Sequence, residues 1–187
     1  SEVVIANNID EYRDICCYGY FATPFIDGEH TSHDFFIENG VVENETIFKG
    51  YKCKKNDEFI GTFLYWELVS VNEKPNITYA LNKLLSKFTN YTGPLNIECI
   101  NNIIIEAHLR RGDIDIIKPI KKPLYLVPVW GTIYDENEDE NEVNIDNLLK
   151  QPGVLNVIKD TKNISKTGNF LQRKALVITR ELPSNLI

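Results

Sequence analysis

The sequence predicts an α+β protein built mostly from antiparallel β-sheet, with a few helices. Most apolar runs are short and rich in β-branched and aromatic residues. Two pairs of such runs are separated by dipeptides that favour tight turns, Asn39-Gly40 and Asn101-Asn102. One longer segment, 77–88, instead has apolar residues at helical spacing. With 187 residues, the chain is long enough to bury a sizeable core.

The first part of the chain is expected to form strands around one hairpin. The expected elements, in order, are a strand at 3–6, a short helix capped by Asp10, a strand at 20–26 interrupted at Pro24, and strands at 30–37 and 41–52. The last two strands flank Asn39-Gly40, which favours a type I′ turn. This hairpin is the strongest local pattern in the sequence.

The remainder alternates strands with two helical segments. The expected elements are a strand within 59–71, a helix over 77–88, strands at 95–100 and 103–109, a strand-rich stretch at 114–134, a helix at 145–150, and strands at 154–159 and 174–180. Asn101-Asn102 joins two of these strands in a credible tight hairpin turn.

Composition limits the function classes. The net charge of −7 argues against nucleic-acid binding, which needs clustered Lys and Arg. No apolar run is long enough to span a bilayer, and the N-terminus lacks a signal-peptide pattern. The four cysteines show no zinc-binding spacing, and Cys99 lies in an apolar run where a reduced thiol is expected. We therefore expect a cytoplasmic protein with neither nucleic-acid nor membrane partners.

The second hairpin carries the sharpest chemical pattern. Strand alternation predicts two shared faces: Asn96, Glu98 and Ile100 on the first strand, and Ile104, Glu106, His108 and Arg110 on the second. Charged side chains inside apolar strands are costly unless they are paired or bind a ligand. Two carboxylates, an imidazole and a guanidinium can together hold Mg²⁺ and phosphate oxygens.

Alternation alone also permits simpler explanations. A strand with one solvated face commonly carries Glu and Arg as cross-strand ion pairs. From alternation alone, an ion-pair ladder is therefore the more frequent interpretation of these charged residues. His108 by itself would more often be a hydrogen-bonded structural histidine than a ligand.

A resemblance to a known family favours the metal site. Residues 93–113, GPLNIECINNIIIEAHLRRGD, resemble the last signature of the ATP-grasp superfamily, in which one strand offers an acid and the next a Glu-x-Asn-x-Arg arrangement. The resemblance implies Glu98 and Glu106 as metal ligands and Arg110 as the catalytic arginine that contacts phosphate or substrate. His108 stands at the asparagine position and is implied as a further ligand. Its imidazole favours transition metals over Mg²⁺.

A second block, ATPFIDGEHTSHD at 22–34, resembles the hinge of the same family. In that family the hinge backbone contacts adenine and a nearby acid holds the ribose. The resemblance therefore implies Thr23, Phe25, Ile26 and Glu29 as nucleotide-binding residues. The usual acid at the start of the hinge is replaced here by Thr23 or Pro24. A plain turn with an exposed Glu29 is the alternative when this block is taken alone.

The resemblance divides the chain at residue 113. It implies an ATP-grasp-like hinge and C-terminal subdomain at 1–113, and a C-terminal extension of strands and a short helix at 114–187, packed on the same domain with an acidic loop at 135–142. The family's N-terminal half, which supplies a lysine and a Gly-rich loop to the phosphates, has no counterpart in the sequence. We expect a homo-oligomer or a partner chain to supply it.

Three functions remain open from the sequence. The first is a nucleotide- and metal-binding domain of an ATP-dependent carboxylate–amine ligase that uses ATP, Mg²⁺ or Mn²⁺, and an acylphosphate intermediate. The second is a non-catalytic binding or structural protein derived from that fold. The third is an ion-pair ladder in an unrelated α+β domain.

Overall fold

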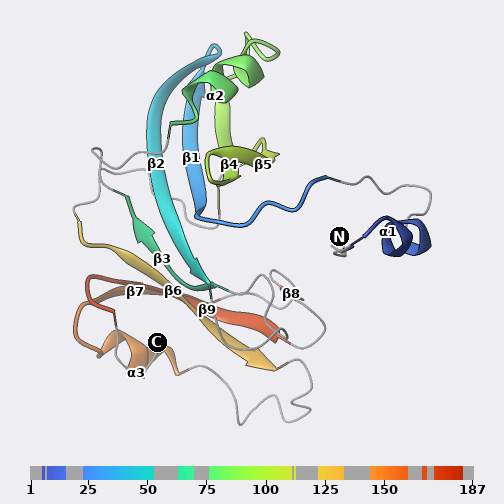
Figure 1. Cartoon of the computed structure of the whole chain (residues 1–187). Coiled ribbons are helices and arrows are strands. Elements are labelled where there is room, and N and C mark those ends of the chain that lie inside the picture. The colour runs from blue at the N-terminus through green and yellow to red at the C-terminus, as the bar shows by residue number, and fades with distance from the viewer. Residues whose placement is uncertain are drawn as a thin grey trace.

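The computed structural model of the chain describes residues 6, 8–15, 23–52, 63–69, 76–110, 112, 122–132, 144–159, 166–167 and 171–182. Within these ranges, nine strands form one antiparallel sheet in the order β5-β4-β1-β2-β3-β6-β9-β7, with β8 beside β9. Figure 1 shows this sheet with few helices around it. The predicted α+β class with a mostly antiparallel sheet is confirmed.

The strands are β1 (His30–Glu38), β2 (Val41–Lys52), β3 (Phe63–Leu68), β4 (Gly93–Ile100), β5 (Ile103–His108), β6 (Tyr125–Thr132), β7 (Val154–Lys159), β8 (Lys166–Thr167) and β9 (Leu171–Thr179). The helices are α1 (Ile9–Ile15), α2 (Thr78–Leu85) and α3 (Ile145–Leu149). No helix within the described ranges is long and apolar enough to cross a membrane. Residues 3–5 of the strand expected at 3–6, the acidic loop at 135–142 and three of the cysteines (Cys16, Cys17 and Cys53) lie outside these ranges.

Both predicted hairpin turns are confirmed. Asn39 and Gly40 have φ of 50° and 77°, and Asn101 and Asn102 have φ of 49° and 66°. A type I′ turn requires positive φ at both central residues, a conformation that Asn and Gly tolerate better than other residues. Each turn therefore fixes which strands pair next to it.

Two expectations near the N-terminus are wrong. Asn8 rather than Asp10 caps α1, because its Oδ1 accepts hydrogen bonds from the backbone N–H groups of Asp10 and Glu11 at 3.0 and 2.9 Å. Of the strand expected at 20–26, residues 20–22 lie outside the described ranges and residues 23–26 do not form a strand. Pro24 lacks a backbone donor and so does not suit a paired strand.

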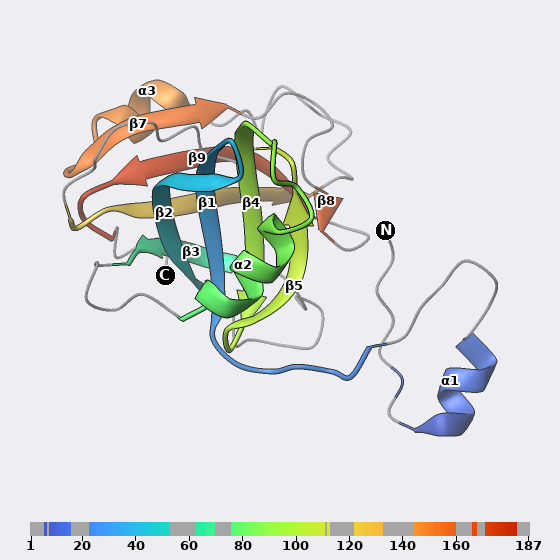
Figure 2. The ribbon, with the colours of Figure 1, turned by 90° about the horizontal axis from the view of Figure 1, so that it is seen from above.

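The core lies on both faces of the sheet. On one face, α2 covers β1 and β4, as Figure 2 shows. Its buried cluster contains Phe35, Ile37, Ile77, Leu81, Leu85, Leu95, Ile97 and Cys99. On the other face, a second cluster fills the region where β2, β3, β6 and β9 meet, and contains Phe48, Leu68, Leu124, Leu126 and Leu176. The polar side chains described below share this second face, at the β5 end of the sheet.

Candidate functional site

Strand register aligns polar side chains from β1, β4 and β5 in two rows across one face of the sheet. We call these the polar rows. Directly paired residues share a face, so each row is a set of neighbours. The first row holds Ser32, Glu98 and Glu106, and the second holds Asp34, Asn96 and His108.

A β-bulge in β5 creates the first polar row. The turn pairs Ile100 with Ile103 and Cys99 with Ile104, but Glu98 then pairs with Glu106. Ile105 is the extra residue, and regular pairing from the same turn would have placed it, rather than Glu106, opposite Glu98. Bulges of this kind re-aim side chains and are common beside active sites.

The bulge also corrects one sequence expectation. Ile104 was predicted to share a face with Glu106, yet it pairs with Cys99 and packs against the cluster beneath α2. Glu106 and His108 do lie on one face, as predicted. Strict alternation fails here because the extra residue places Ile103 and Ile104, which precede it in β5, on the faces opposite to those that alternation predicts.

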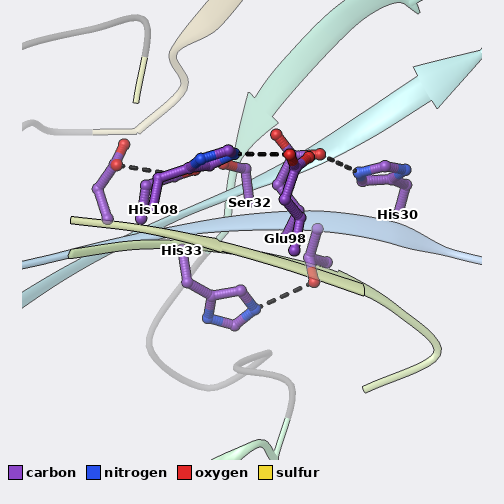
Figure 3. A network of polar contacts seen from close by, with 9 residues as sticks. His30, Ser32, His33, Glu98 and His108 are labelled. Carbon is purple, nitrogen blue, oxygen red and sulfur yellow. Dashed lines mark hydrogen bonds and ion pairs between the residues drawn. The ribbon is translucent and has the colours of Figure 1, made fainter. Parts of the chain in front are cut away.

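Each carboxylate of the first row has a histidine partner. His30 Nε2 lies 3.0 Å from Glu98 Oε2, and His108 Nε2 lies 3.0 Å from Glu106 Oε1. An ionised carboxylate can only accept, so the His30 imidazole donates its N–H to Glu98. In Figure 3, His30, Glu98 and His108 lie on one side of the sheet, and His33 points to the other. The Glu98 and Glu106 side chains are 30% and 55% exposed, within reach of a solvent-borne ligand.

Asp34 and Asn96 anchor the second row and the chain after β5. The Asn96 side-chain amide donates to Ser32 Oγ and to Asp34 Oδ1, both at 3.0 Å. The backbone N–H of Gly112 donates to Asp34 Oδ1 at 2.7 Å. A Cβ on Gly112 would lie 2.8 Å from the Asp34 carboxylate oxygens, so glycine permits this approach. This contact holds Gly112, two residues after Arg110, against β1.

Asn101 connects the second hairpin to the predicted hinge. Its side chain accepts from the Glu29 N–H at 3.0 Å and donates to the Asp27 carbonyl at 2.8 Å. Its backbone N–H donates to the Glu29 carbonyl at 2.9 Å. A Cβ on Gly28 would lie 2.0 Å from the Asn101 side chain, which explains the glycine between them. The hinge segment is therefore held against the turn of the carboxylate hairpin.

The structure gathers some predicted site residues and separates others. Glu98, Glu106 and His108 lie together on the polar rows. Arg110 follows β5 directly and is exposed. Three hinge residues precede β1 in irregular backbone and lie away from strand pairing: Thr23, Phe25 and Ile26.

Glu29 is engaged elsewhere. Its carboxylate forms an ion pair with Lys49 at 2.5 Å. Lys49 pairs in register with Thr31, on the face opposite His30. Glu29 therefore does not join Glu98 and Glu106 on the polar rows.

Sequence reasoning missed His30, Ser32 and Asp34 as members of the site. All three lie at alternate positions of β1, so strand periodicity places them on one face. Only the pairing of β1 with β4, whose registered residues are more than sixty positions apart, brings them to Glu98. Local patterns do not contain that information.

The carboxylates fit a metal bound together with a nucleotide better than a metal held by protein alone. Among the described residues, no group of three or more His, Cys, Asp or Glu side chains could hold a metal ion. Mg²⁺ commonly binds proteins through one or two carboxylates and completes its shell with phosphate oxygens and water. Glu98 and Glu106 together supply two carboxylates for such a site.

Cys99 lies directly behind this pair, on the face covered by α2. Burial, with a smaller contribution from the Glu98 charge, raises the pKa of its thiol to about 11. The thiol is fully buried and unpaired with any other cysteine. A protonated thiol of this kind is an inert core residue.

Comparisons with known proteins bear on the fold. No family model matches the sequence, and no curated protein matches it. Among solved structures, the L-amino acid ligase from Bacillus licheniformis matches with a TM-score of 0.54 and 14% identity. The chain has an ATP-grasp-like fold. The match covers 83% of this chain and 49% of the ligase chain, so this domain corresponds to about half of that enzyme's length.

Proposed function

We propose that this ATP-grasp-like domain binds ATP with Mg²⁺ or Mn²⁺ on its polar rows, as part of an ATP-dependent carboxylate–amine ligase. The observation that carries the proposal is the direct cross-strand pairing of Glu98 with Glu106. Like charges placed directly opposite each other destabilise a sheet by up to about 1 kcal/mol. A divalent cation between the carboxylates would remove that repulsion.

The polar rows offer a role for each of their charged residues. Glu98 and Glu106 would hold the cation, and His108, whose Nε2 contacts Glu106, would become a further nitrogen ligand only by turning its ring toward the cation. Arg110 would contact the phosphate or the acyl substrate. The cation itself supplies neutralisation of phosphate charge and orientation of the phosphate oxygens. The segment 23–29, tied to Asn101, would lie along the nucleotide.

The ligase chemistry consists of two displacements. A substrate carboxylate oxygen attacks the γ-phosphorus of ATP, the bond to the β-phosphate oxygen breaks, and ADP leaves. An amine then attacks the acyl carbon of the resulting acylphosphate, and inorganic phosphate leaves with the bonding electron pair. Both steps develop negative charge on phosphate oxygens, which is why a cationic site beside Arg110 suits them.

Thermal melting with ATP and each metal tests the binding proposal. A ligand that binds only the native state stabilises it by about 2.7 kcal/mol at one hundred times its dissociation constant. We expect millimolar Mg²⁺–ATP or Mn²⁺–ATP to raise the melting temperature, and Glu106→Gln to abolish the increase. Glu43→Gln, which removes the same charge from an exposed position of β2, should retain it. An unchanged wild-type melting temperature would contradict the proposal.

A second candidate is a non-catalytic binding or structural protein with the same fold. The observation that favours it is that both carboxylates already have a histidine partner: His30 forms a hydrogen bond with Glu98, and His108 forms an ion-pair contact with Glu106. In this case the polar rows are a self-sufficient network, and neutralising Glu106 would weaken it. Nucleotide would then leave the melting temperature unchanged, and Glu106→Gln would lower it.

A further inference from the structure

We propose that His30 is a positioning residue that fixes the carboxylate of Glu98 for cation binding. This inference rests on the proposed function, because Glu98 is one of the two carboxylates assigned to the cation. His30 is the first residue of β1, and its imidazole Nε2 lies 3.0 Å from Glu98 Oε2. The histidine side chain is only 8% exposed, so its ring is part of the protein interior.

An aromatic clamp holds the imidazole in place. The rings of Phe63 and Trp66 meet it edge-to-face, with centroid distances of 4.9 and 5.5 Å and interplanar angles of 86° and 90°. The two aromatic rings also pack on each other at 4.2 Å. Edge-to-face contacts favour one ring orientation over others. Rotation of the His30 ring away from Glu98 would break both contacts.

Gly50 makes room for this clamp. It pairs in register with His30 on one side and with Trp66 on the other. A Cβ at this position would lie 2.6 Å from the Phe63 ring and 2.9 Å from the Trp66 ring. A strand residue with a side chain would therefore displace the rings from His30. The glycine in an otherwise β-prone strand has a packing reason.

The unpaired ring nitrogen indicates which tautomer is present. His30 Nδ1 is buried and has no hydrogen-bond partner in the described part of the chain. A buried N–H without an acceptor is costly, so the proton belongs on Nε2, where Glu98 accepts it. The imidazole is thus set to donate to one oxygen of Glu98. Oε1 of the same carboxylate makes no hydrogen bond among the described residues and remains available to a cation.

Metal affinity measured with two substitutions at His30 tests the inference. The probe is Mn²⁺ titrated in the presence of ATP and followed by the electron paramagnetic resonance of free Mn²⁺. Loss of a residue that orients a metal ligand typically lowers affinity about 10- to 100-fold. We expect His30→Phe, which keeps a ring for the clamp, to show such a loss. His30→Gln keeps an N–H donor near the Nε2 position and should recover most of the affinity.

His33→Gln is the matched control. His33 lies in the same strand on the opposite face, where its Nε2 contacts Thr31 Oγ1 at 3.0 Å and its ring stacks on Phe35. This substitution should lower the melting temperature without changing Mn²⁺ affinity. The contrast separates a positioning role from a loss of stability, because a purely structural His30 would behave like His33.

A spectroscopic readout needs neither metal nor nucleotide. Nitrogen-15 NMR of the metal-free wild-type protein should show His30 protonated at Nε2 and unprotonated at Nδ1. Protonation at Nδ1 instead would overturn the inference, even if His30→Phe fails to fold. Wild-type Mn²⁺ affinity in folded His30→Phe would also overturn it while leaving the proposed function intact. Absence of Mn²⁺–ATP binding by the wild type would overturn both.

Discussion

Glu98 and Glu106 are direct partners across β4 and β5 only because a bulge at Ile105 moves Glu106 into register. The Asn101-Asn102 turn alone would pair Glu98 with an isoleucine, an arrangement without charge repulsion. The chain instead places two carboxylates opposite each other and gives each a histidine neighbour. An arrangement that opposes stability is typical of a site that binds a ligand of opposite charge.

Neutralising Glu106 should therefore stabilise the metal-free protein. In Glu106→Gln the repulsion with Glu98 disappears, while a polar side chain of the same size remains beside His108. We expect the free energy of unfolding in urea to rise by up to about 1 kcal/mol in the presence of a chelator. Glu43→Gln should change it less, since Glu43 lies on another strand. A lower stability for Glu106→Gln would instead support the closed network of the non-catalytic candidate.

The turn residue Asn101 should contribute more to stability than its neighbour Asn102. Asn101→Ala loses the two side-chain hydrogen bonds to the hinge segment and places a residue that tolerates positive φ poorly at a φ of 49°. We expect a loss of about 3 kcal/mol, since each hydrogen bond and the backbone strain are worth roughly 1 kcal/mol apiece.

Asn102→Gly is the matched substitution, because glycine suits the second position of a type I′ turn. It should leave the free energy of unfolding within about 0.5 kcal/mol of the wild type. Equal losses for both variants, measured by urea denaturation, would show that the side-chain contacts of Asn101 to residues 27–29 do not matter.

The parts of the fold that the sequence predicted are those that the local chemistry of turn residues determines. Asn39-Gly40 and Asn101-Asn102 permit few backbone conformations, so they specified both hairpins and the limits of β2. Asn8 was missed as the cap of α1 because Asn and Asp are nearly equivalent in that role. The segment 23–26 was wrongly expected to be a strand because its apolar residues suit one, while Pro24 opposes one.

The sequence predicted several of the residues that form the site, but not how these residues are arranged. Alternation gave Glu98 on one strand and Glu106 and His108 on a shared face of the next, and the family resemblance implied their roles as metal ligands. The bulge at Ile105 has no marker in the sequence, because a bulged position that is not glycine needs no special residue. The role of His30 depends on its pairing with β4 and on rings from β3, which are contacts between distant segments.

His108 should shift the metal preference of the site toward Mn²⁺. An imidazole nitrogen suits transition metals better than Mg²⁺, whereas an amide oxygen suits the harder cation. In His108→Asn, the ratio of Mn²⁺ to Mg²⁺ affinity in the presence of ATP should fall several-fold, as measured by calorimetric titration. The same ratio in wild type and variant would show that His108 only supports Glu106.

Cys99 should make stability decrease at alkaline pH. Its folded-state pKa is raised from an ordinary value of 9.0 to about 11, chiefly by burial. The unfolded thiol therefore ionises first, so the stabilisation is complete below pH 9 and is lost as the pH rises through 11. Its full size is roughly 2–3 kcal/mol, since one pKa unit corresponds to about 1.4 kcal/mol.

Because tyrosines and lysines also titrate in this range, the measurement is a comparison of urea unfolding between wild type and Cys99→Ala from pH 8 to 11. The variant, less stable at pH 8, should lose less stability as the pH rises, and parallel curves would contradict the assignment.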